Sequence, residues 1–257
     1  MTPHREIVRR ADEAVETARA SGRLDRRAFL RLSTIGISTT VLAACNSAGP
    51  ESAKSLLSFA TRQNERFERW ILGSGTAARP GAVPPAGARF PAYWVSDSVP
   101  MWDVATRGAW TLEITGAVTT PRTLSYDELR GMRLVTQRVP HYCVEGWSAT
   151  ADFTGVTMRT LLSAVAPNAD ARFVDFMSFD DGYHESWDIE SALHPQTMVV
   201  LAKDGQRLSP RWGAPARLHG PVKLGYKNTK FLTKIVVMPA ANGGYWSDRG
   251  YEWYGGT

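Results

Sequence analysis

The chain contains only two cysteines, Cys45 and Cys143, and this count limits how its fold can be stabilised. Cys45 follows Leu42-Ala43-Ala44, and the tetrapeptide resembles a bacterial lipobox, in which the cysteine becomes the acylated first residue of the mature protein. If Cys45 carries lipid, Cys143 has no disulfide partner. The fold must then depend on buried apolar surface, and 257 residues with 43% apolar content suffice for one substantial core.

The amino-terminal residues are typical of an export signal. The run Asp25-Arg26-Arg27-Ala28-Phe29-Leu30-Arg31 resembles the twin-arginine consensus, and the apolar residues 32–44 are too few to span a bilayer permanently. An ordinary amphipathic helix with a chance arginine pair is the alternative. We expect residues 1–44 to be a twin-arginine and lipoprotein signal region, and the mature protein to be periplasmic and anchored to the membrane surface through Cys45. Because that route carries folded proteins that commonly hold a cofactor, it favours a ligated Cys143.

The net charge argues against one class of function. The whole chain has a formal charge of +5, but residues 1–49 supply eight basic and five acidic residues to totals of 30 and 25. The remainder is therefore near +2. It lacks the strongly basic character of nucleic-acid-binding domains, so we expect no nucleic-acid partner.

Periodicity and turn residues outline the part after the signal. Residues 45–89 are expected to form a helical collar followed by a linker rich in Gly and Pro. Short helices are predicted from a capping box at Ser125 and over 158–165. Residues 180–187 are predicted to form a polar loop, and 242–257 an ordered aromatic tail. Strands are predicted over 111–118, 134–139, 173–179, 197–202 and 231–238.

Polar and aromatic residues surround Cys143. His141, Glu145 and Trp147 flank the thiol, and Gly146 leaves the backbone open to a bulky ligand. A lone free cysteine more often behaves as a small buried hydrophobe, so these residues alone leave a packing role and a functional role equally open.

A second stretch has the residues of an anion-binding cradle. Gly and Pro residues from 210 onward can bring backbone amides close to a ligand, while Arg217, Lys227 and Lys230 supply charged donors. The alternative is a solvated basic face. The Gly, Tyr, Asn and Thr residues interleaved with the cations favour the cradle.

Four motifs together resemble the molybdopterin-binding domain of the sulfite oxidase family, in the compact bacterial branch that includes methionine sulfoxide reductases. They occur in family order and spacing: Cys143-Val-Glu-Gly-Trp147, Phe153-Thr-Gly155, Gly213-Ala-Pro-Ala-Arg217 and Gly225-Tyr-Lys227-Asn-Thr-Lys230. The resemblance implies an α+β molybdopterin-binding fold with mixed β-sheets and flanking short helices, placed here at residues 90–257. It also implies a molybdenum-molybdopterin cofactor.

The resemblance implies roles for individual residues. Cys143 falls where the family has its molybdenum ligand, and a soft sulfur donor suits that metal. The expected cofactor-binding residues are Ser178, Arg217, Lys227, Asn228, Thr229 and Lys230, with Tyr93 and Trp94 as candidates for an amino-terminal contact. Polar groups expected near the open face of the metal are His141, Asp181, Tyr183 and His184, of which His141 is the preferred proton donor.

These inferences predict an exported oxidoreductase that transfers an oxygen atom, or two electrons, to or from a small S- or N-containing substrate. Its expected electron partner is a haem-bearing membrane subunit or a soluble carrier. Two other functions stay open. One is a cofactor-free enzyme with Cys143 as nucleophile and His141 or His184 as base, and the other is a lipid-anchored protein that only binds an anion.

Overall fold

The computed structural model describes residue 64 and residues 93–257. The predicted signal at 1–44, the lipidation site Cys45 and, apart from Asn64, the predicted collar and linker at 45–89 lie outside the described residues. None of the helices in the described part has the length and apolar character needed to cross a membrane.

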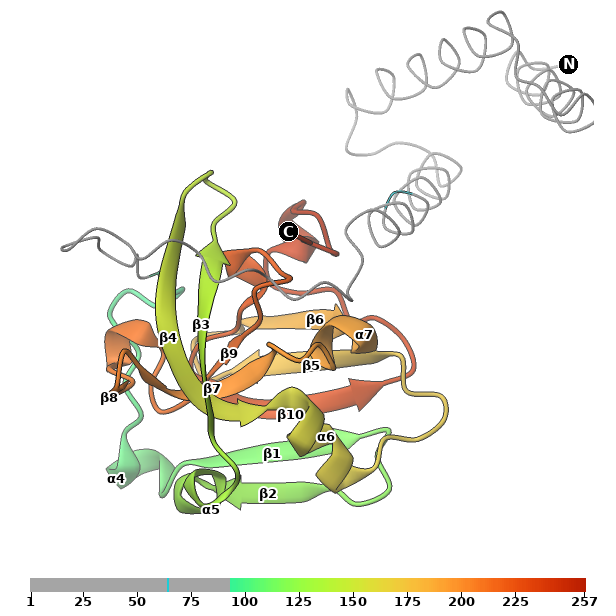
Figure 1. Ribbon diagram of the computed structural model, residues 1–257, viewed down its shortest axis with the longest axis horizontal. Helices are drawn as coiled ribbons and strands as arrows, with labels where there is room; N and C mark the ends of the chain where they lie inside the picture. The colour runs from blue at the N-terminus through green and yellow to red at the C-terminus, as the bar shows by residue number, and fades with distance from the viewer. Residues whose placement is uncertain (1–63, 65–92) are drawn as a thin grey trace, which may run out of the picture. The chain divides into compact units, whose positions relative to one another are not determined.

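One five-stranded sheet mixes parallel and antiparallel pairs (Figure 1). Its order is β2 (Arg122–Ser125), β1 (Thr111–Gly116), β10 (Leu232–Met238), β5 (Phe173–Ser178) and β6 (His184–Asp188). The pair β1 and β10 is parallel although the strands are far apart in sequence, and the other pairs are antiparallel. The carboxyl-terminal strand β10 therefore lies at the centre of this sheet.

The second sheet is antiparallel. Its order is β3 (Val135–Tyr142), β4 (Ser148–Thr157), β7 (Met198–Lys203) and β8 (Gln206–Arg207), and β9 (Arg217–His219) also pairs with β7. The long β3–β4 hairpin projects from one side of the domain (Figure 1). The remaining elements are short: α4 (Val104–Arg107), α5 (Tyr126–Gly131), α6 (Met158–Val165), α7 (Ile189–Ala192), and the 3₁₀ turns η1 (Pro210–Trp212), η2 (Gly225–Lys227) and η3 (Ser247–Arg249). The predicted α+β fold with mixed sheets and short helices is confirmed.

The apolar run of β7 reflects burial on both faces of its sheet. Val199 and Leu201 pack into the main core with strands of the first sheet, whereas Met198 and Val200 pack into a smaller cluster on the opposite face. Successive side chains of a strand point to opposite faces, so a strand covered on both sides needs apolar residues throughout. The two sheets and the helix α6 thus enclose the main core, and the smaller cluster packs on the other face of the second sheet.

The predicted helix boundaries agree closely with the structure. The Ser125 hydroxyl accepts the Glu128 N–H at 3.2 Å, and the Glu128 carboxylate accepts the Ser125 N–H at 2.7 Å, which is the predicted capping box. The helix α6 ends at Val165; Thr157 caps its amino terminus and Ala166, whose φ is 49°, caps its carboxyl terminus.

The strand predictions were incomplete, and the short strands β2 and β9 were among those not predicted. The strand β3 continues to Tyr142, beyond the predicted end at residue 139, because Pro140 lies on an edge strand where its missing N–H costs no ladder bond. The ten-residue strand β4 was not predicted. The residues 184–188 form β6 instead of the polar loop expected over 180–187, because they pair with β5.

Candidate active site

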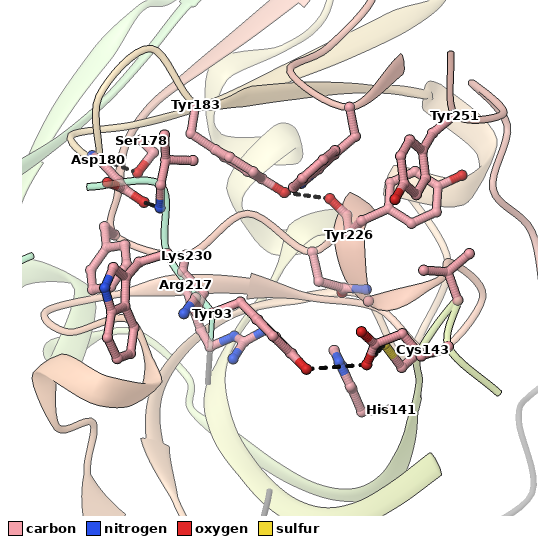
Figure 2. Close-up of a pocket in the computed structure, with 18 of the residues that line it drawn as sticks. Tyr93, His141, Cys143, Ser178, Asp180, Tyr183, Arg217, Tyr226, Lys230 and Tyr251 are labelled. Atoms are coloured by element: carbon pink, nitrogen blue, oxygen red, sulfur yellow. Dashed lines mark hydrogen bonds between the residues drawn. The ribbon is translucent and has the colours of Figure 1, made fainter. Parts of the chain in front are cut away.

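A cavity of about 390 Å³ gathers chemically active side chains from both sheets and their loops (Figure 2). The residues come from the segment before α4, the end of β3, the β3–β4 turn, the loop after β5, the start of β9, the η2 region and the carboxyl-terminal tail. They are Tyr93, Trp94, Val95, His141, Cys143, Val144, Glu145, Trp147, Ser178, Asp180, Tyr183, Arg217, Gly225, Tyr226, Asn228, Lys230, Phe231, Trp246 and Tyr251.

The thiol end of the cavity is the tight turn between β3 and β4. The Cys143 N–H donates to the Trp147 carbonyl at 2.9 Å, and Gly146 takes a φ of 85°, which favours glycine. The Glu145 carboxylate accepts hydrogen bonds from the Trp147 indole at 2.9 Å and the Tyr93 hydroxyl at 3.1 Å. The Cys143 thiol also points toward this carboxylate, at 3.8 Å. The turn therefore fixes the sulfur against an acceptor.

The electrostatics of Cys143 do not favour a free nucleophile. Burial, with the adjacent Glu145 carboxylate, raises the pKa of the Cys143 thiol above its ordinary value. A cysteine nucleophile needs the opposite shift, from a nearby cation or a helix amino terminus. Burial, with the charges of Arg217 and Lys230, lowers the pKa of His141 to about 3, so this ring is a weak base as well.

The other end of the cavity holds two buried cations. Arg217 is 3% exposed, and within the described part of the chain its guanidinium donates only to the backbone carbonyls of Leu218 and Trp212, each at 3.3 Å. The Lys230 ammonium has no hydrogen-bond partner among the described residues. Burial, with the Arg217 charge, lowers the pKa of Lys230 to about 7. Neither cation is bonded to a carboxylate of residues 93–257, so this end of the cavity is a site for an anion such as a phosphate.

Two motif glycines allow the close packing around this site. Gly213 has a φ of 100°, and a Cβ atom there would lie 2.8 Å from the Lys230 Cβ. A Cβ atom at Gly225 would lie 2.6 Å from the Nε2 atom of His141. The loops before β9 and at η2 can therefore approach the cavity only because these positions lack a side chain.

Nine of the residues expected at the site line this one cavity. They come from four separate stretches of the sequence: Tyr93, Trp94, His141, Cys143, Ser178, Tyr183, Arg217, Asn228 and Lys230. Asn228 is also a structural residue, since its side chain accepts the Gly220 N–H at 2.7 Å and donates to two carbonyls of the same loop.

Four expected residues do not line the cavity. The Lys227 ammonium is buried and binds the Glu185 carboxylate at 2.6 Å. Thr229 donates to the Phe176 carbonyl, and the His184 ring lies 3.1 Å from the Asp175 carboxylate. Asp181 is exposed to solvent. The structure thus gives these side chains, Asp181 apart, partners of their own inside the fold.

Several lining residues were not assigned a role from the sequence. Asp180 was passed over for its neighbour Asp181, and nothing local distinguishes two consecutive aspartates. Trp246 and Tyr251 were missed although the aromatic tail was expected to be ordered, and Tyr226 was missed although its motif was singled out. The high content of aromatic residues in the tail was the available signal, but it does not indicate which rings face the cavity.

The residues present fit a metal that brings most of its own ligands. The described residues contain no group of three or more His, Cys, Asp or Glu side chains that could hold a metal ion. The cavity instead offers one thiol at one end and two cations at the other. That donor set suits a cofactor that combines a sulfur-bound metal with an anionic tail, because a soft thiolate binds the metal and the cations bind the anion.

Comparison with known proteins agrees with this chemistry. Residues 97–246 match the family described as "Oxidoreductase molybdopterin binding domain". The "Putative protein-methionine-sulfoxide reductase subunit YedZ1" of Azospira oryzae is 38% identical over 234 residues, which cover 90% of this chain and 88% of that protein. The "Protein-methionine-sulfoxide reductase catalytic subunit MsrP" of Xanthomonas axonopodis pv. citri is 31% identical over 161 residues, 57% of this chain. The alignment covers only 50% of the length of that MsrP.

One solved structure overlaps in part. The sulfane dehydrogenase SoxCD from Paracoccus pantotrophus superposes with a TM-score of 0.49 at 18% identity, over 51% of this chain and 39% of that chain. The sequence comparisons therefore decide the assignment. The chain belongs to the molybdopterin-binding oxidoreductase family, and its cofactor is molybdenum-molybdopterin.

Proposed function

We propose that the chain is the catalytic component of a reductase that acts on methionine sulfoxide in proteins. Two relatives, 38% and 31% identical, have this activity in their names. The observation that supports the proposal most is that Cys143, Arg217 and Lys230, distant in sequence, line one cavity. This substrate narrows the expected S- or N-containing compound to a sulfoxide on a polypeptide.

Different residues along the cavity would bind different parts of the cofactor. Cys143 would ligate the molybdenum as a thiolate, and Arg217 with Lys230 would hold the anionic end of the pterin, with Ser178 and Asn228 beside it. When bound, the cofactor supplies two-electron oxygen-atom transfer. The Tyr183 hydroxyl donates to the Tyr226 carbonyl (Figure 2), so it would position this wall and not serve as a free acid. His141 stays a candidate for a polar contact to substrate, as a neutral ring.

The rim of the cavity supports a polypeptide substrate. Three large side chains on it are unusually exposed: Tyr93 at 60%, Val144 at 49% and Tyr251 at 41%. Exposed apolar side chains grouped at one opening mark a surface that another molecule covers. The backbone of a substrate protein could rest on this rim while its sulfoxide side chain enters the cavity.

The location and electron supply are part of the same proposal. The Arg26-Arg27 motif would direct export to the periplasm, and a lipid on Cys45 would hold the enzyme at the membrane. A haem-bearing membrane subunit or a soluble carrier would then return the electrons that each reduction consumes. Mass spectrometry of the exported protein tests the anchor, since the mature chain should begin at an acylated Cys45.

The central experiment measures metal and turnover together. Full-length protein made with its cofactor pathway should contain about one molybdenum per chain and should reduce methionine sulfoxide in an oxidised protein, using a chemical electron donor. Cys143→Ser should abolish turnover, whereas Leu134→Ala, an exposed position that does not line the cavity, should retain the metal and most of the rate. Molybdenum-loaded enzyme that reduces no form of methionine sulfoxide would contradict the proposed substrate. Rapid alkylation of Cys143 in loaded enzyme would contradict its role as ligand.

A further inference from the structure

The carboxylate of Asp180 is buried at the wall of the cavity, with an exposure of 3%. It accepts hydrogen bonds from the Val95 N–H at 2.6 Å, the Ser96 N–H at 2.9 Å and the Ser96 hydroxyl at 2.5 Å. Among the described residues these are the only hydrogen bonds of this side chain, and no ion pair within 4 Å joins it. A buried carboxylate is costly unless it is well hydrogen-bonded, so Asp180 is satisfied by a segment about 85 residues earlier in the chain.

That segment, residues 93–96, forms part of the cavity wall, and we call it the strap. Tyr93, Trp94 and Val95 all line the cavity. The Trp94 ring lies 5.5 Å from the Lys230 ammonium, and the Tyr93 hydroxyl reaches Glu145 beside Cys143 (Figure 2). The strap therefore extends from the cationic end of the cavity to the thiol end.

The chain on the carboxyl-terminal side of the strap has a separate attachment. Trp102 packs edge-on against Phe179 at 5.2 Å between ring centroids, and its indole donates to the Gly108 carbonyl at 2.9 Å. Residues from about 102 onward would stay in place if the strap were released. The strap itself is held by the exposed Tyr93–Glu145 bond at one end and by the three bonds to Asp180 at the other.

The geometry points to Asp180 as a positioning residue that holds the strap over the bound cofactor and so slows its escape. The carboxylate needs to touch no reacting atom for this, because it acts through residues 93–96. The inference rests on the proposed function only for the identity of what the cavity holds.

Hydrogen exchange of the cofactor-free, full-length protein tests directly whether Asp180 holds the strap. Asp180→Asn removes the charge and one acceptor, so the amides of Val95 and Ser96 should exchange about tenfold faster. Ser96→Ala removes only the hydrogen bond from the Ser96 hydroxyl, so it should also speed the exchange of these amides, by a smaller factor. Asp97→Asn makes the same chemical change at an exposed neighbour and should match wild type. Exchange in the central strand β10 should not change in any of them.

Cofactor release supplies the second measurement. After loaded protein is diluted and filtered over time, the retained molybdenum should fall about tenfold faster in Asp180→Asn, somewhat faster in Ser96→Ala, and at the wild-type rate in Asp97→Asn. The inference would be overturned if Asp180→Asn released molybdenum at the wild-type rate, or if amide exchange rose equally in β10. If Asp180→Asn does not fold, wild-type exchange and release in Ser96→Ala would overturn it instead. Suppose that wild-type protein never acquires molybdenum, while the strap amides still exchange faster in Asp180→Asn. That result would refute the proposed function and would still support the role of Asp180 in holding the strap.

Discussion

Replacement of Lys227 by methionine tests the point where the family resemblance and the structure differ most. The resemblance implies that Lys227 binds the cofactor, but its ammonium lies 2.6 Å from the Glu185 carboxylate and both side chains are 0% exposed. Methionine fills a similar volume and leaves Glu185 buried without its cation. Because both partners are buried, the damage should appear in the stability of the fold.

The size of the effect follows from the contacts that remain. Removal of one partner from a buried ion pair costs about 3–5 kcal/mol. Glu185 keeps the Trp246 N–H at 2.8 Å and the Ser247 hydroxyl at 3.1 Å, so we expect a loss near the lower limit, about 3 kcal/mol. With a urea m-value of about 2 kcal/mol/M, the unfolding midpoint should fall by roughly 1.5 M.

The assay is urea unfolding of cofactor-free protein, followed by circular dichroism. The double variant Lys227→Met, Glu185→Gln is the matched control, because a neutral amide no longer requires a cation and should recover most of the stability. A single variant within about 0.5 kcal/mol of wild type that nevertheless fails to take up molybdenum would refute this reasoning and return Lys227 to the cofactor site.

Two further predictions concern the cationic end and its packing. The pKa of Lys230 is lowered to about 7 in the folded, cofactor-free protein, so the unfolded chain binds more protons between pH 7 and the ordinary lysine value. The free energy of unfolding of wild type should therefore rise with pH through this window relative to Lys230→Met, and an equal pH dependence of the two proteins would contradict the burial of this cation. Gly225→Ala places a Cβ atom 2.6 Å from the His141 Nε2 atom and should lower molybdenum content at least severalfold while the circular dichroism spectrum of the fold is kept. An alanine variant with the wild-type metal content would show that this contact is not needed.

Local sequence patterns determined most of the secondary structure. The capping box at Ser125, the periodicity of α6 and the strands β1, β5, β7 and β10 were predictable because each depends on neighbouring residues. The strands β4 and β6 were not predicted, since both depend on partners elsewhere in the chain: β4 pairs with β3 and β7, and β6 pairs with β5. A strand whose pairing supplies its stability carries a weak local signal.

The sequence alone also determined the chemistry of the site, because a single thiol and a cluster of cations next to Gly and Pro residues are visible as residue types. Only the tertiary structure decided which of those cations is available. Lys227 and Lys230 are three residues apart in one motif, yet Lys227 is enclosed by Glu185 and the carboxyl-terminal tail, whereas Lys230 lies in the cavity beside Arg217. The difference arises from contacts with β6 and with residues 93–96, and non-local packing of this kind is not encoded in the spacing of a motif.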